Sequence, residues 1–529
     1  MQGISVDGSQ GNLIQSTQEM ILRFTTEVSG QVERWTMQLI DCPDDLQEIE
    51  RTVHIAYARG ADLLVAGLMA AVIKDGQIDV ASEQTRKQFS RPLQKGRERT
   101  VAVQLLGGMM VWATTLYCAP KKKLFRKDDA PRVGLDITLA QFGFGKGVSP
   151  GLQSRVARQV ALYPSIAFAH KELIQQGVKL DAKAIKRITY QCGEGLLALR
   201  RHRIKLLRAR KLKAGTELTG KRVSVQIDGG RMKIRGEMKP KTATDEPTDA
   251  DDLLIGDVPG RSQHTPKRTY AADWREPKLM TIFVHDEHGK MLKKTKATID
   301  GTLLGPDAIA EIVAMHLHRL GAAEAQSLTF VADGAPWIWD RIDRIIALAG
   351  LSKVATYQVL DCCHAVHHLS QALASLGLDR RSRNPLYRQL RSQLRNGQWE
   401  RVVADLSELQ DPEQPSAELE TEISYLRRHG EAGRLSYVKY KRLGLPCGSG
   451  AIESGIRRVI NLRLKSNAMF WKSENAESML QVRSQVVPDQ WDTAMSELSE
   501  FRKAEAYDSW QWEPQNMSIK NETSPTLAT

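Results

Sequence analysis

The stretch of sequence that decides the fold is Val223-Ser224-Val225-Gln226-Ile227-Asp228-Gly229-Gly230. Its β-branched residues predict a strand over 223–228, and the acidic residue before two glycines predicts a turn at the end of that strand. The same pattern recurs in Thr329-Phe330-Val331-Ala332-Asp333-Gly334. A third acidic residue, Glu453, lies early in a helix-type segment that follows Gly448-Ser449-Gly450.

Three carboxylates from distant parts of a chain can form a site for divalent cations. Two hard cations about 3.5–4 Å apart need oxygen ligands, and convergent carboxylates supply them. Each motif alone is a common turn. Their order along the chain makes the set Asp228, Asp333 and Glu453 a candidate two-metal phosphodiester site.

The segment around these motifs predicts an α/β domain. After the first strand we expect strands at Leu279–His285, Met291–Thr298, Leu328–Asp333 and Val354–Leu360, and helices at Gly305–Leu320 and after Pro336. This order describes an RNase H-like fold, a mixed five-stranded sheet with flanking helices. In that fold, strands one and four are neighbours, which would bring Asp228 beside Asp333. Residues 239–268 predict a loop insertion.

The N-terminal third predicts helices at 14–40 and 45–75 and a small β element after them. Residues 101–118 nearly reach membrane-spanning length. Gly107-Gly108 divides them into two β-prone halves, so a hairpin is the better interpretation. Only Cys118 lies there, without the paired cysteines of a zinc ribbon, and we predict no zinc.

Residues 165–195 resemble a helix-turn-helix. Ser165 would cap a first helix that ends at Gly177, and Asp181 would cap a short second helix, Ala182 to Cys192. That helix carries basic residues suited to the DNA major groove, although an ordinary helical hairpin with a solvated face stays open. The candidate DNA contacts are Lys183, Lys186 and Arg187.

Further basic residues predict contacts to phosphates. The run at 197–213 includes Arg200, Arg201, Arg203 and Arg208, and the segment after Glu453 includes Arg457, Arg458, Arg463 and Lys465. A solvated face is the alternative for both. In a helical insertion at 376–446, Trp399 is a candidate for stacking on an unpaired base. Trp337, Trp339 and Trp471 are expected in the core.

Composition agrees with a polyanionic partner. The chain has 529 residues, a net charge of +13 and a pI of about 9.3. Six unpatterned cysteines indicate a reduced compartment, and the N-terminus shows no basic-then-apolar signal. We expect no membrane association. The expected segments are 1–90 (helical), 91–125 (β), 126–215 (DNA-binding), 216–375 and 447–490 (catalytic), 376–446 (insertion) and 491–529 (C-terminal helix and tail).

The C-terminal third resembles bacterial insertion-sequence DDE transposases, in the Mutator-related branch with an all-helical insertion before the catalytic Glu. The matching text is Gly444-Leu445-Pro446-Cys447-Gly448-Ser449-Gly450-Ala451-Ile452-Glu453-Ser454, then Arg463-Leu464-Lys465 and Met469-Phe470-Trp471. Leu360-Asp361-Cys362-Cys363-His364 looks like the family's Cys/Asp-x-x-His signature. The resemblance covers about residues 150–485.

The resemblance implies a function and roles for these residues. Asp228, Asp333 and Glu453 would hold two Mg²⁺ (or Mn²⁺) ions, cut double-stranded DNA at transposon ends and join the 3′-ends to target DNA. Asp361 and His364 would assist at the active site. The Cys and His residues after Asp361 also suggest zinc or a packed cluster, but neighbours on one helix cannot all face one ion.

Two rival functions remain open from the sequence. One is a transposase-derived protein that binds DNA without cutting it, and the other is a metal-dependent nuclease of the same fold. Because two transposon ends must be brought together, we expect a homodimer or larger assembly on DNA, in the cytoplasm at the bacterial nucleoid.

Overall fold

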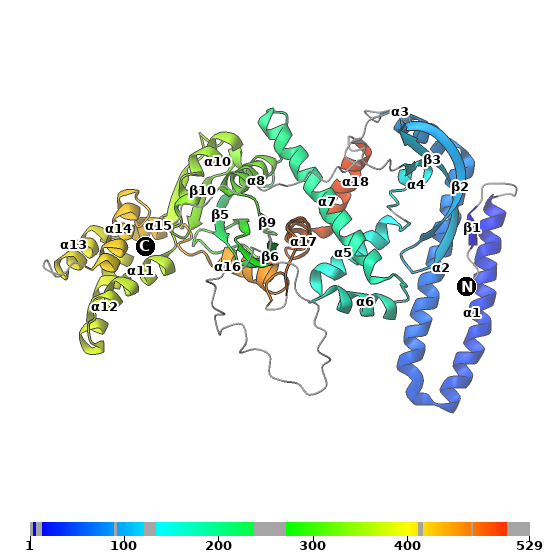
Figure 1. The fold of residues 1–529 in the computed structure, drawn as a ribbon, viewed down its shortest axis with the longest axis horizontal. Helices are drawn as coiled ribbons and strands as arrows, with labels where there is room; N and C mark the ends of the chain where they lie inside the picture. Colours follow the sequence, from blue (N-terminus) through cyan, green and yellow to red (C-terminus); the bar gives the residue numbers. More distant parts are fainter. Residues whose placement is uncertain are drawn as a thin grey trace, which may run out of the picture. The chain divides into compact units, whose positions relative to one another are not determined.

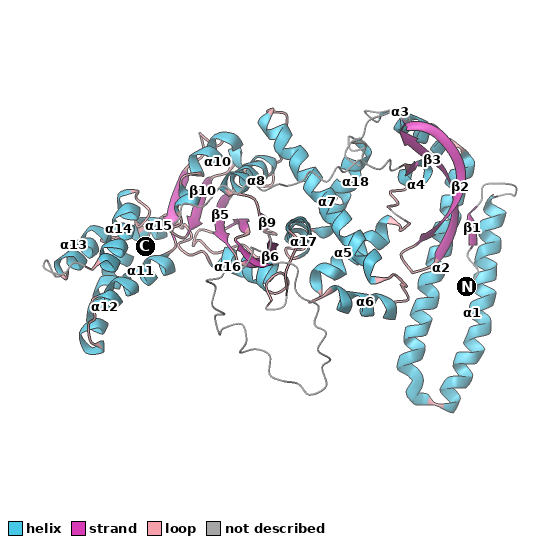
Figure 2. Cartoon of the chain, in the orientation of Figure 1, coloured by secondary structure: helices cyan, strands magenta, loops and turns pink. Residues whose placement is uncertain are grey.

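The structure is a computed structural model that describes residues 4–6, 13–88, 93–120, 134–145, 147–236, 271–410, 416–466 and 469–504. The chain forms two compact units, Met1–Cys192 with Asp492–Thr529, and Gly193–Trp491. We call them unit 1 and unit 2 (Figures 1 and 2). The loop insertion predicted at 239–268 and the tail after 504 lie outside the described residues.

Unit 1 begins with a helical hairpin, as the sequence predicts. Its elements are α1 (Leu13–Asp41), η1 (Pro43–Asp45), α2 (Leu46–Asp75) and α3 (Gln77–Gln88). The stretch Pro43–Asp75 is long and apolar enough to cross a membrane by length and composition, with 28% of its most apolar window buried, which is weak evidence for a span.

The hairpin predicted at 101–118 is confirmed. β2 (Leu93–Gln104) and β3 (Met110–Pro120) pair antiparallel around Gly108, which has a φ of +90°. The Asp62 carboxylate of α2 accepts hydrogen bonds from the N–H groups of Gly107 (2.9 Å) and Met109 (3.0 Å), which fixes the turn. β1 (Ile4–Val6) and β4 (Leu135–Asp136) also pair with β3.

Unit 1 continues with α4 (Ile137–Gln141), α5 (Pro150–Leu162) and α6 (Ile166–Gln175). Both predicted caps are present, because Ser165 accepts from Phe168 N at 3.2 Å and Asp181 accepts from Ala184 N at 2.5 Å. The predicted short second helix is wrong, since α7 (Ala182–Arg208) is one helix of 27 residues. Buried leucines continue at helical spacing through 196–207, so nothing ends the helix at Cys192.

Unit 2 contains the predicted mixed five-stranded sheet. Its order is β11-β10-β5-β8-β9, in which β5, β10 and β11 run parallel to one another and β8 pairs antiparallel with both β5 and β9. The strands are β5 (Arg222–Gly229), β8 (Lys278–Val284), β9 (Thr298–Thr302), β10 (Ser327–Ala332) and β11 (Thr356–Leu360). The third strand was predicted too early. Residues 291–297 are largely exposed and lysine-rich, whereas 298–302 are buried.

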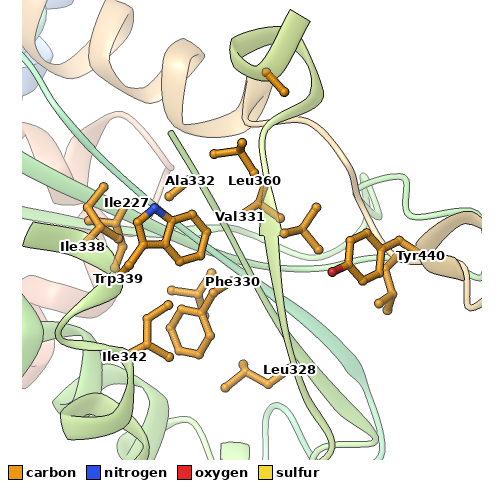
Figure 3. Close-up of a cluster of buried hydrophobic side chains, with 14 of the residues drawn as sticks. Ile227, Leu328, Phe330, Val331, Ala332, Ile338, Trp339, Ile342, Leu360 and Tyr440 are labelled. Carbon is orange, nitrogen blue, oxygen red and sulfur yellow. The ribbon is translucent and has the colours of Figure 1, made fainter. Parts of the chain in front are cut away.

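Helices cover both faces of this sheet. Val223, Val225 and Ile227 point toward α8 and α10 and join their apolar residues in one core, part of which Figure 3 shows. The alternate residue Gln226 bonds to α16 on the opposite face. The helices are α8 (Pro306–Arg319), η2 (Ala322–Glu324), α9 (Pro336–Trp339), α10 (Ile342–Ala349), α16 (Gly450–Ile456), a π turn (Arg457–Asn461) and α17 (Ser473–Val486).

The insertion is helical, as predicted. It comprises α12 (Arg380–Arg395), α13 (Trp399–Glu408), α14 (Ala417–Glu431) and α15 (Tyr437–Arg442), and follows α11 (Cys362–Ser375). The predicted C-terminal helix is α18 (Trp491–Ala504). Trp339 (6% exposed) and Trp471 (8%) are buried, and Trp337 is partly buried against the same core as Trp339.

One pair of strands was not predicted. β6 (Met232–Gly236) and β7 (Ala271–Arg275) form a separate two-stranded antiparallel sheet. Both strands are short and alternate charged with small or apolar residues, which gives a weak strand signal.

Candidate active site

Three parallel strands end side by side, and an acidic residue stands at each end. β10 pairs Ala332 with Ile227 of β5 and with Leu360 of β11. The next residue on each strand is therefore part of one row, with neighbouring backbones about 4.8 Å apart. The row consists of Asp361, Asp333 and Asp228. The predicted proximity of the strand ends that carry Asp228 and Asp333 is confirmed, and Asp361 extends the row.

Asp228 and Asp333 repel each other. Burial, and then the charge of Asp333, raise the pKa of Asp228 to about 6. Asp228 Oδ1 accepts from Gly229 N at 2.6 Å, and Asp333 Oδ1 accepts from Ala335 N at 3.1 Å. Two partly buried carboxylates that repel each other fit the oxygen donor set of a hard divalent cation.

Asp361 has a different role from the other two. It is 1% exposed, and its Oδ1 accepts the N–H groups of Cys363 and His364 at the start of α11. Its Oδ2 accepts the N–H of Ser449. Burial raises the pKa of Asp361, but the His364 imidazole and Ser449 outweigh burial and lower it to about 2. Asp361 thus holds two helix starts in place.

Glu453 reaches the same edge on α16. Gln226 of β5 accepts from Ile452 N at 2.9 Å and donates to Gly448 O at 3.0 Å, which fixes the start of α16 against the sheet. The Ser449 hydroxyl donates to Glu453 Oε1 at 3.1 Å. The Glu453 side chain itself is exposed.

His364 lies beside Asp361, with its Nδ1 3.7 Å from the Asp361 carboxylate. Among the described residues, the side chains that could share one metal ion are Asp361, His364 and Glu453, whose ligand atoms lie within 4.8 Å of one another. The His364 pKa is raised by Asp361 first, and also by the charges of Asp333 and Asp228. The predicted ligand set of Asp228, Asp333 and Glu453 is therefore not gathered in this structure, in which Glu453 lies with Asp361 and His364.

The loop after Asp333 is held by the helical insertion. A Cβ on Gly334 would lie 2.0 Å from the ring of Tyr425 of α14, so only glycine fits there. His368 stacks on Tyr425 at 3.6 Å, and its Nδ1 lies 2.6 Å from Glu422. His368 therefore belongs to a packed, hydrogen-bonded cluster. Sequence analysis missed Tyr425 and Gln226, which lack an acidic signature.

Two predicted phosphate contacts are wrong. Arg200 is 6% exposed and pairs with Asp300 (2.8 Å) and Glu477 (2.7 Å). Arg463 is 4% exposed, and its guanidinium lies 5.3 Å from the centre of the Trp471 ring. Side chains buried in this way stabilise the fold and cannot reach DNA.

Trp399 packs against Gly430, where a Cβ would lie 2.1 Å from the indole, so one face of its ring is covered.

The other predicted contacts lie at the surface. Arg203 is half-buried, and Arg208 is exposed but pairs with Glu311 at 2.6 Å. The other predicted DNA contacts are exposed, namely Lys183, Lys186, Arg187, Arg201, Arg457, Arg458 and Lys465.

In comparisons with known proteins, no family model, no curated protein and no solved structure matches this chain.

Proposed function

We propose that this chain is a DDE-type DNA transposase whose unit 2 cuts DNA and joins 3′-ends by a two-metal mechanism. The observation that carries the proposal is the row of acidic strand ends beside α16, in which Asp228 and Asp333 lie on neighbouring strands. The strand order, with the first strand between the second and the fourth, also fits an RNase H-like domain.

The carboxylates supply the kind of oxygen donors that a pair of divalent cations needs, and Glu453 would move from His364 toward Asp228 and Asp333 to complete the set. Asp228 and Asp333 would hold them, together with Glu453, and two Mg²⁺ or Mn²⁺ ions would activate the attacking oxygen and stabilise the leaving one. His364 lies near Glu453, and the charges of Asp228 and Asp333 also act on it. A proton on its imidazole would therefore stabilise anionic groups at this edge of the sheet. Asp361 and Ser449 position Glu453 through α16.

The exposed cations support a DNA substrate. Arg457, Arg458 and Lys465 follow Glu453 closely and would neutralise phosphates beside the site. The cations Lys183, Lys186 and Arg187, which lie in the part of α7 that belongs to unit 1, would bind the transposon ends. We also propose that the protein works as a homodimer or larger assembly at the bacterial nucleoid.

A strand-transfer assay tests the proposal. The DNA is a labelled fragment of the sequence that flanks the gene, incubated with target plasmid, Mg²⁺ and the protein. We expect joined product that disappears in Asp333→Asn and Glu453→Gln, while the exposed control Glu287→Gln keeps it. Cutting without joining would instead identify a nuclease. A metal-independent gel shift without any cutting would identify a DNA-binding descendant.

A further inference from the structure

The two-stranded sheet of β6 and β7 extends directly from the candidate active site. β6 begins just after Gly230, and β7 leads through Glu276 and Pro277 into β8. Gly230 N donates to Pro277 O at 2.8 Å, so the two connections run together. At most about 17 Å of extended backbone separates Lys233 from Asp228. That length equals about five base steps of DNA.

The inner side of this sheet holds it to unit 2. Met232 is 0% and Ile234 4% exposed, and β6 exchanges backbone hydrogen bonds with Trp471, from Trp471 N to Lys233 O (3.1 Å) and from Arg235 N to Trp471 O (2.8 Å). The Arg235 guanidinium adds a hydrogen bond to Phe470 O at 3.2 Å, so buried apolar residues, backbone bonds and this side chain together anchor the sheet.

The outer side combines cations with an exposed aromatic ring. Lys233 lies opposite Trp274, and Arg235 lies opposite Ala272, so these four share one face. Arg231 is exposed and comes directly before β6, two residues before Lys233. Trp274 is 53% exposed, and the Lys233 ammonium lies 5.1 Å from the centre of its ring. The same ammonium lies 5.5 Å from the centre of the Phe470 ring.

This pattern matches the chemistry of a single nucleic-acid strand. Such strands bind where cations follow the backbone and an aromatic ring stacks on a base. Arg231, Lys233 and Arg235 recur at every second residue, and no carboxylate lies among them on β6. A base on Trp274 would also lie beside the Lys233 charge.

We propose that the outer face of β6 and β7 binds a single DNA strand next to the cleavage position, with one base stacked on Trp274 and its phosphates near Arg231, Lys233 and Arg235. The assignment of this strand as the one adjoining the cut rests on the proposed function. Binding of an unpaired strand here does not depend on cutting.

Fluorescence anisotropy with a labelled oligothymidylate and the full-length protein tests this surface. We expect Trp274→Ala to weaken binding by about 5- to 150-fold, since stacking contributes about 1–3 kcal/mol per base. Trp274→Phe should keep most of the affinity, and affinity for a blunt duplex should change less than about threefold. Lys233→Gln should lower the salt dependence of single-strand binding.

The matched control is Trp112→Ala, because Trp112 is 44% exposed on β3 of unit 1. Equal affinities of Trp274→Ala and Trp112→Ala for the oligonucleotide would overturn the proposal, as would equal losses for single strand and duplex. Thermal melts establish that each variant is folded. A wild-type protein that shows this Trp274 dependence but no strand transfer would leave the surface standing and refute the transposase function.

Discussion

Replacing Asp228 by asparagine tests whether the carboxylates at the strand ends repel each other when no cation is bound. Burial and Asp333 raise the pKa of Asp228 from 3.8 to about 6. The folded state therefore holds this proton more tightly than the unfolded chain, and stability is lost as pH rises from 3.8 through about 6. One pKa unit corresponds to about 1.4 kcal/mol, and solvent screening of this partly exposed group reduces the full effect to about 1–2 kcal/mol.

Asparagine keeps an oxygen for the Gly229 N–H, which lies 2.6 Å from Asp228 Oδ1, but carries no charge. We expect Asp228→Asn to be more stable than wild type at pH 8 by about 1–2 kcal/mol, or about 2–6 °C in Tm. Near pH 4 this difference should shrink to a fraction, because wild-type Asp228 is then protonated in the folded state.

Magnesium should reverse the order of the two proteins. A cation at one hundred times its Kd adds about 2.7 kcal/mol to the stability of the form that binds it, which exceeds the advantage of about 1–2 kcal/mol expected for Asp228→Asn without metal. We expect this gain in wild type and not in Asp228→Asn, measured by thermal melts at pH 8 with EDTA or Mg²⁺. Asp343→Asn, a change at an exposed carboxylate of α10, is the control. An unchanged Tm of Asp228→Asn at pH 8, or an equal Mg²⁺ gain in both proteins, would refute the reasoning.

Three further substitutions test other parts of the site. Arg200→Ala leaves two buried carboxylates without their cation and should lower the free energy of unfolding in urea by about 3–5 kcal/mol. The control Arg201→Ala should change it by less than about 0.5 kcal/mol. Equal effects of the two substitutions would contradict the buried network. Gly334→Ala should lower the free energy of unfolding by about 1–3 kcal/mol and abolish cleavage. Adding Tyr425→Ala to this variant should restore part of the lost stability. If it restores none, the predicted clash with the Tyr425 ring is excluded. Ser449→Ala should lower cleavage about tenfold and leave DNA affinity unchanged, and a parallel fall in affinity would argue against a positioning role.

The central sheet could be predicted because its strands are apolar runs that end in turn residues. β5, β8, β10 and β11 lie within a few residues of their predicted places. β9 reads Thr-Ile-Asp-Gly-Thr, with a single large apolar residue, and was placed too early. Its Asp300 is buried only because Arg200 and His316 contact it, and those partners are far away in the sequence.

The site was partly predictable for a related reason. Acidic residues after apolar strands identify Asp228 and Asp333, but the register that adds Asp361 to the row depends on pairing between β10 and β11. The burial of Arg200 depends on Glu477, which lies 277 residues away along the chain. The sequence of α7 alone therefore does not show which of its cations are buried and which are exposed. Likewise, Trp399 is covered by Gly430 of another helix.

The central claim is that acidic side chains from separate elements share divalent cations. Anomalous diffraction from crystals soaked in Mn²⁺ tests it most directly. We expect a manganese peak with oxygens of both Asp228 and Asp333 at about 2.0–2.6 Å. Manganese bound solely by Asp361, His364 and Glu453, or no peak at this edge of the sheet, would contradict it.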